Sequence, residues 1–389
     1  MRIHGAKVLI PGEGLTDTDV AISGSVIDSV GGQAGGGGGA RQIDASGLLL
    51  LPGIVDIHGD AFEHFLMPRS GVHFPTPVAL AEVDRQLVAN GITTAYHGVT
   101  YSWEPGLRGR DNVLAVMRAL ESLCNHLGCD TRVHLRYEMH NLDAEAEVVE
   151  WLADGRVGLL ALNEHTDMIL RRLDRAEKLS QYTERSGLDA AAYRRLVEGV
   201  AARSDEVPAS VARIGHAAVA AGVPLASHDD ETPAMRRHYR GLGSGICEFP
   251  CNAETAREAI AAGEPVVLGA PNVLRGGSHD GRLNAEEAIM EGLCTVLASD
   301  YYYPAAAHAA FLLSQRGLDL ENAWALLSSG PARAVGLDDR GLIAPGYRAD
   351  LVLIDPATPA GPAVMATVAQ GHLVYAHQGA QAVRHPVMS

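Results

Sequence analysis

Short apolar runs alternate with longer amphipathic stretches through most of this chain. The runs are rich in β-branched residues and end at glycine, proline or polar positions, as buried strands do. Eight of them lie at residues 53–58, 92–97, 132–138, 158–163, 223–227, 246–249, 266–269 and 295–299. Because strands that alternate with helices form parallel sheets, eight such units predict an α/β fold, a (β/α)8 TIM-like barrel.

Between the runs, apolar residues recur at helical spacing. Val113, Met117 and Leu120 lie on one face of such a stretch. Asp111 is expected to cap this helix and Gly128 to end it. Further helices are expected at residues 143–154, 253–262 and 284–293. These stretches supply the outer layer of the predicted barrel.

Both ends of the chain have strand character without intervening helices. Strands are expected at residues 6–10, 19–22, 26–30 and 48–51, and again at 351–354, 363–370 and 372–376. The two ends of a domain often lie close together. We therefore expect a small β-sandwich domain built from residues 1–50 and 340–389, beside a barrel domain of residues 51–339.

Composition narrows the class of protein. Hydrophobic residues make up 47% of the 389 residues and charged residues 20%, which is typical of a globular chain. The net charge of −16 argues against a nucleic-acid surface or a polybasic membrane patch. The five cysteines lack zinc-ribbon spacing, and the apolar runs are too short for a membrane span. We expect a reduced, cytoplasmic protein whose partner is a small-molecule substrate, with a homo-oligomer as a compatible assembly.

Six side chains with metal-ligating chemistry stand at the ends of predicted strands. They are His58, Asp60, Glu138, His165, His228 and Asp300. In a barrel of this kind the carboxyl ends of all strands meet at one face, where active sites are built. We therefore expect these six side chains to meet at one mouth of the barrel. His97 and Glu248 occupy similar positions, and the sequence leaves their roles open.

The spacing of these residues favours a site for two metal ions. His58 and Asp60 lie two residues apart, so they point to the same side of a strand and can bind one ion. His165 and His228 can bind a second ion. Imidazole and carboxylate ligands suit divalent cations, with zinc as the expected metal and manganese or iron as alternatives.

Two like cations about 4 Å apart need a bridging anion. A carboxylated lysine often fills that role, but the chain has two lysines, and the one in the barrel region, Lys178, lies in a polar stretch. Glu138 is therefore the expected bridge. Asp300, at the last strand, is expected to ligate a metal and to take a proton from the attacking water.

Several segments resemble a known family. Residues 51–58 and 341–353 are similar to the opening and closing segments of the amidohydrolase superfamily. Within it, Leu225-Ala226-Ser227-His228-Asp229-Asp230 and residues 269–279 resemble the PhnM family of the carbon–phosphorus lyase pathway. Shorter matches occur at residues 134–136, 248–250 and 299–302.

The resemblance implies a barrel hydrolase that acts on α-D-ribose 1-methylphosphonate 5-triphosphate and releases pyrophosphate. Carried over by position, the six side chains above form its metal site. Arg69 and Arg275 are implied to contact phosphate groups. Ser278 and His279 lie in a glycine-rich stretch that would offer backbone N–H groups to the same phosphates.

Two other functions fit the same residues. A binuclear site of this composition can hydrolyse a C–N bond in a cyclic amide, an N-acyl compound or a deaminase substrate. A catalytically inactive scaffold is the third hypothesis, although the presence of all six ligand types favours an enzyme. A substrate panel distinguishes the first two, because one releases pyrophosphate and the other ammonia or an amine.

Overall fold

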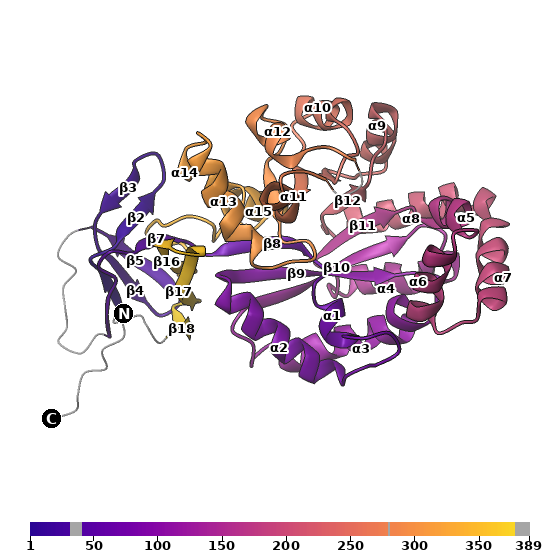
Figure 1. Ribbon diagram of the computed structural model, residues 1–389, viewed down its shortest axis with the longest axis horizontal. Coiled ribbons are helices and arrows are strands. Elements are labelled where there is room, and N and C mark those ends of the chain that lie inside the picture. The colour runs from indigo at the N-terminus through magenta and orange to yellow at the C-terminus, as the bar shows by residue number, and fades with distance from the viewer. Residues whose placement is uncertain (32–40, 279–280, 378–389) are drawn as a thin grey trace.

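A computed structural model describes residues 1–31, 41–278 and 281–377 of the chain, and eight parallel strands form a barrel at its centre (Figure 1). The strands are β8 (Ile54–Gly59), β9 (Ile92–Tyr101), β10 (Asp130–Glu138), β11 (Leu159–Asn163), β12 (Leu225–His228), β13 (Ile246–Glu248), β14 (Val266–Gly269) and β15 (Val296–Ala298). Each strand pairs with the next one along the chain, and a parallel bridge between Gly59 and Asp300 joins the last strand to the first. The predicted barrel is thereby confirmed.

Helices cover the outside of the barrel, so the strands are buried on both faces. β9, for example, is buried at all ten of its positions, and its threonines and His97 are enclosed together with its apolar residues. The covering helices are α1 (Glu63–Leu66), α2 (Thr76–Ala89), α3 (Arg110–Leu123), α4 (Glu145–Ala153), α8 (Val207–Ala220), α9 (Pro233–Gly241), α10 (Ala253–Ala261), α11 (Ala270–Arg275), α12 (Ala285–Met290), α13 (Ala305–Gln315), α14 (Leu320–Ala325) and α15 (Ser329–Ala334). None of the described helices is long and apolar enough to cross a lipid bilayer.

The ends of helix α3 differ from the prediction. Gly109, not Asp111, is the N-cap, and its extended backbone starts the helix one residue before Asp111. Asp111 lies in the first turn, where its charge still favours the helix dipole. The helix ends at Leu123, and the amide of Gly128 instead donates a hydrogen bond to the carboxylate of Asp84 on α2.

Two further sheets pack against each other beside the barrel (Figure 1). Their strands are β1 (Arg2–His4), β2 (Lys7–Ile10), β3 (Gly14–Asp17), β4 (Val20–Ser23), β5 (Val26–Val30), β6 (Gln42–Asp44), β7 (Leu49–Pro52), β16 (Leu351–Thr358), β17 (Gly361–Ala369) and β18 (His372–Ala376). β7 pairs in antiparallel fashion with β16, so the two ends of the chain share one sheet. A core that includes Ile3, Ile43, Leu50 and Leu351 lies between the sheets, as expected for a β-sandwich. The domain boundaries near residues 50 and 340 stay a prediction.

Three helices, α5 (Thr166–Arg172), α6 (Ala176–Ser186) and α7 (Ala190–Ala201), are inserted between β11 and α8. They enclose a small core of their own, which includes Tyr182 and Tyr193. The buried carboxylate of Glu104, after β9, anchors them, because it accepts two hydrogen bonds from Arg185 and one from the Tyr193 hydroxyl. This insertion forms one wall of the barrel mouth.

Candidate functional site

The carboxyl ends of the first and last barrel strands are clasped together at the mouth. The amide of Asp300 donates to the carbonyl of His58, and the amide of Asp60 donates to the carbonyl of Asp300, both at 3.0 Å. Asp300 takes a positive φ of 57°, and so does Asp229, with a φ of 62°, after β12. Such backbone is uncommon for residues other than glycine and concentrates at functional sites. The clasp fixes His58, Asp60 and Asp300 relative to one another.

Three groups of side chains in the described part of the chain place donor atoms within 4.8 Å of one another. The groups are His58, Asp60 and Asp300; His165, His228 and Asp229; and His58, His134 and Glu248. Five of the six predicted ligands belong to these groups, and all lie at the carboxyl ends of barrel strands or directly after them. Their assignment as metal ligands stays a prediction.

Glu138 is the sixth predicted ligand, and it falls in none of the three groups formed by described residues. Its Oε1 lies 2.5 Å from Nδ1 of His165. Burial alone would raise the pKa of Glu138, but the attraction of His165 outweighs it and lowers this pKa to about 2. A carboxylate in this place orients a metal-binding imidazole. Glu138 is thus positioned to orient His165, and its role as a metal bridge stays a prediction.

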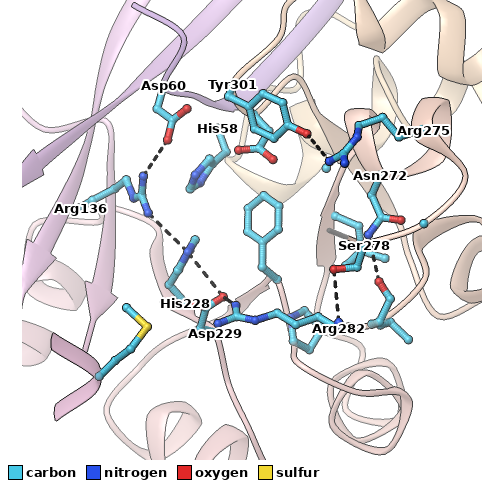
Figure 2. Close-up of a pocket in the computed structure, with 18 of the residues that line it drawn as sticks. His58, Asp60, Arg136, His228, Asp229, Asn272, Arg275, Ser278, Arg282 and Tyr301 are labelled. Atoms are coloured by element: carbon cyan, nitrogen blue, oxygen red, sulfur yellow. Dashed lines mark hydrogen bonds and ion pairs between the residues drawn. The ribbon is translucent and has the colours of Figure 1, made fainter. Parts of the chain in front are cut away.

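The carboxylates at the mouth have opposed electrostatic environments. Burial and the neighbouring charge of Asp60 raise the pKa of Asp300 to about 6. Burial alone would also raise the pKa of Asp60, but the attraction of the Arg136 guanidinium outweighs burial and lowers this pKa. Nη1 of Arg136 donates to Asp60 at 3.0 Å, while its Nη2 lies 3.4 Å from Nε2 of His228 (Figure 2). Carboxylates whose pKa values are pushed apart in this way often divide the roles of base and permanent anion.

A cavity of about 290 Å³ opens over these groups (Figure 2). Four of its lining residues are Arg136, Arg172, Arg275 and Arg282. Arg275 donates to the hydroxyl of Tyr301 at 3.2 Å, and Arg282 forms an ion pair with Asp229. The cavity therefore combines carboxylates that are candidate metal ligands with guanidinium groups.

Only some of the predicted substrate-binding residues line this cavity among the described residues. Arg275 and Ser278 line it, and their contact with substrate stays a prediction. Arg69 is exposed, forms an isolated bridge with Val72 and is absent from the described lining. His279 lies outside the described residues, so its placement is not tested. Lys178 is partly exposed on α6, where it donates to Gln181.

Sequence reasoning missed several residues that reach the site. His134 and Arg136 precede Glu138 on β10 at intervals of two, so all three share one face of the strand. That alternation is a signal that could have found them. Arg172 is the last residue of α5, and the insertion after β11 brings it to the cavity. Glu248, whose role the sequence left open, lies fully buried beneath the mouth.

Known proteins resemble this chain in sequence and structure. The model of the amidohydrolase family matches residues 49–379. An α-D-ribose 1-methylphosphonate 5-triphosphate diphosphatase from Escherichia coli (strain K12) is 33% identical over 323 residues, which are 80% of this chain and 85% of that protein. An adenine deaminase from Methylobacterium sp. (strain 4-46) is 26% identical over 368 residues, 89% of this chain but 53% of that protein. The crystal structure of 5-methylcytosine deaminase from Klebsiella pneumoniae has a TM-score of 0.63 at 15% identity and covers 99% of this chain and 100% of that one. The chain therefore belongs to the amidohydrolase family, and it is a metal-dependent hydrolase.

Proposed function

We propose that this hydrolase cleaves a phosphoanhydride bond in a ribose phosphonate that carries a 5-triphosphate, and that it releases pyrophosphate. The observation that carries the proposal is the set of four arginines around the cavity, beside the candidate metal ligands. Guanidinium groups bind phosphate oxygens in a bidentate manner and keep their charge at all physiological pH values. The diphosphatase relative supports the same substrate class.

The residues at the mouth fit divalent cations. Two candidate groups lie there: His58, Asp60 and Asp300 form one, and His165 and His228 belong to the other, with Glu138 in contact with His165. We propose zinc as the metal, with manganese or iron as alternatives, because imidazole and carboxylate donors are mixed. Bound divalent cations supply Lewis acidity toward phosphoryl oxygens and activate water.

The chain's own groups position the substrate and move the proton. Arg172, Arg275 and Arg282 would hold the phosphate chain along the cavity. Asp300 would accept the proton of the attacking water and pass it to the leaving group, since it lines the cavity beside His58 and Asp60. Glu63, an acid near the mouth, is paired with Arg108 through two hydrogen bonds, so its charge is offset before substrate arrives.

Hydrolysis of a C–N bond is the second candidate function. The adenine deaminase relatives favour it, because their similarity extends over 89% of this chain. The apolar part of the cavity, which includes Phe249 and Leu268, could contact a heterocyclic ring. A neutral heterocycle would give these four arginines no phosphate group to bind, which is why phosphoanhydride cleavage is preferred.

A product assay distinguishes the two functions. Protein loaded with zinc or manganese is incubated separately with a ribose 5-triphosphate bearing a 1-phosphonate, with ribose 5-triphosphate, with adenine and with dihydrouracil. The proposal predicts pyrophosphate from the triphosphates and no ammonia from adenine. Ammonia or ring opening without pyrophosphate would instead establish C–N hydrolysis. Asp300→Asn serves as the control for contaminating hydrolases.

A further inference from the structure

A fully buried carboxylate lies beneath the mouth of the barrel. Glu248 ends β13 and is 0% exposed, and imidazoles from three other strands surround it. Its Oε2 lies 3.2 Å from Nδ1 of His58, 3.3 Å from Nδ1 of His228 and 3.7 Å from Nε2 of His134. A buried carboxylate is costly unless other groups compensate its charge. The contacts that the three imidazoles make with Glu248 decide whether its charge is compensated.

The hydrogen bonds around Glu248 are incomplete. His228 accepts from Arg136 at Nε2, so its Nδ1 carries the proton and donates to Glu248. In contrast, Nδ1 of His58, Nε2 of His134 and Oε1 of Glu248 have no hydrogen-bond partner among the described residues. A proton on Nδ1 of His58 would satisfy its contact with Glu248 at 3.2 Å, but it would leave Nε2 of His134 without a donor.

The protonation state of His134 leaves its contact with Glu248 unsatisfied. Its Nδ1 lies 3.0 Å from the carbonyl of Ile57, and a carbonyl can only accept. Nδ1 must then carry the proton, and Nε2 of the neutral ring presents a lone pair to the Glu248 carboxylate. Two acceptors face each other in a place that water does not reach. A cation between them removes the conflict.

The distances also favour a cation. Charge-assisted hydrogen bonds between nitrogen and oxygen are about 2.7–2.9 Å long. Donors that share a tetrahedral zinc ion are about 3.3–3.5 Å apart, because each lies about 2.0–2.2 Å from the metal. The contacts of Glu248 with His58 and His134, at 3.2 and 3.7 Å, bracket the second range.

We propose that one divalent cation of the zinc type is bound at this deep site by Nδ1 of His58, Nε2 of His134 and the carboxylate of Glu248. A neutral imidazole offers a single lone pair, so His58 serves this site and not a second one at the mouth. Asp60 and Asp300 are then left to face the substrate. Nε2 of His228 would bind the other ion together with His165 only in place of its contact with Arg136. The proposal rests on the metal dependence of the proposed function but not on its substrate.

Two isosteric variants test the deep site by metal content. His134→Asn keeps an amide donor in the place of Nδ1 and removes Nε2, while Glu248→Gln keeps the shape and removes the charge. His97→Asn is the matched control, because His97 is also a buried strand histidine but packs against Phe62. Each apoprotein is reloaded with zinc, dialysed, and analysed by mass spectrometry for metal per chain and by circular dichroism for folding.

We expect His134→Asn and Glu248→Gln to lose one equivalent of zinc, or to bind it at least about tenfold more weakly, while His97→Asn matches the wild type. Folded His134→Asn protein with wild-type zinc content would overturn the proposal and assign a proton on His58 as the partner of Glu248. Should the variants fail to fold, anomalous diffraction at the zinc edge from wild-type crystals decides directly. A peak within about 2.3 Å of Nε2 of His134 supports the site, and peaks confined to Asp60, Asp300 and His165 refute it.

The outcomes also separate this site from the proposed reaction. A wild-type protein that fills the deep site but releases no pyrophosphate refutes the substrate and leaves the site intact. Metal-dependent pyrophosphate release by a protein whose deep site stays empty refutes the deep site and leaves the proposed reaction intact.

Discussion

The buried guanidinium of Arg236 offers a test of how the site is held. Arg236 is 0% exposed on α9, and it donates to Ser227 at 2.6 Å and to the carbonyl of Ile246 at 3.1 Å. It also contacts the carboxylates of Asp230 and Glu264, at 3.3 and 3.0 Å. Through these contacts it joins the last turn of chain around β12, next to His228, to the start of β13.

Replacing Arg236 with methionine removes the charge and keeps most of the volume. Glu264 retains its contact with Arg240, but Asp230 loses its cationic partner while 0% exposed. Breaking a buried ion pair from one side costs about 3–5 kcal/mol, and the partner that Glu264 retains places this variant near 3 kcal/mol. The neighbouring Arg237 pairs with Glu258 at the surface, so Arg237→Met should cost about 0–1 kcal/mol.

Urea unfolding followed by tryptophan fluorescence measures both variants against the wild type. We expect a clearly lower midpoint for Arg236→Met and a nearly unchanged one for Arg237→Met. We also expect weaker zinc binding in Arg236→Met, because the segment that carries His228 loses its anchor. Equal midpoints for the two variants would refute the claim that the buried network holds this strand end.

Three further predictions concern the cavity, the proton transfer and the contact between barrel and sandwich. Arg275→Ala should raise KM for a triphosphate at least about tenfold through loss of a charged hydrogen bond. Arg69→Ala, outside the described cavity lining, should change KM less than about threefold. Equal effects of the two variants on KM in steady-state assays would contradict the cavity assignment. Asp300→Asn should lower kcat by about 10²–10⁴, and an unchanged kcat at normal metal content would remove Asp300 as the proton acceptor. Burial alone would raise the pKa of Asp130, but its arginine partners, Arg132 and Arg340, outweigh it and lower this pKa. Asp130 therefore stabilises the fold above about pH 3.9, its ordinary pKa, and this contribution is lost as the pH falls further. Asp130→Asn should accordingly cost about 3 kcal/mol at pH 7 and much less at low pH, and urea curves that differ from wild type equally at both pH values would disprove this.

The barrel could be predicted from the sequence because its strands are buried on both faces. The run at 132–138, for example, is the carboxyl-terminal part of β10, which begins two residues earlier, at Asp130. The short strands β1, β3 and β6 were missed for the opposite reason. They have three or four residues and are partly exposed, so their apolar pattern is too brief to detect.

The candidate site was predictable where polar residues end a strand and obscure where they lie within one. His58 and Asp300 follow apolar runs and stand out, whereas His134 lies in the middle of β10 and signals nothing by position alone. Glu138 was chosen as a bridge by counting lysines, and no pattern could show that it contacts His165 at Nδ1. Arg136 reaches the site only because β10 places it opposite Asp60, on a strand 76 residues away along the chain.

Phosphorus-31 NMR of a single reaction tests the central claim most directly. The protein is stripped with a chelator, divided, and incubated with the ribose phosphonate 5-triphosphate before and after reloading with zinc or manganese. Our account predicts that pyrophosphate and the 5-monophosphate appear together, in equal amounts, only in the reloaded sample. An unchanged triphosphate spectrum in a reloaded protein that releases ammonia from adenine would contradict it.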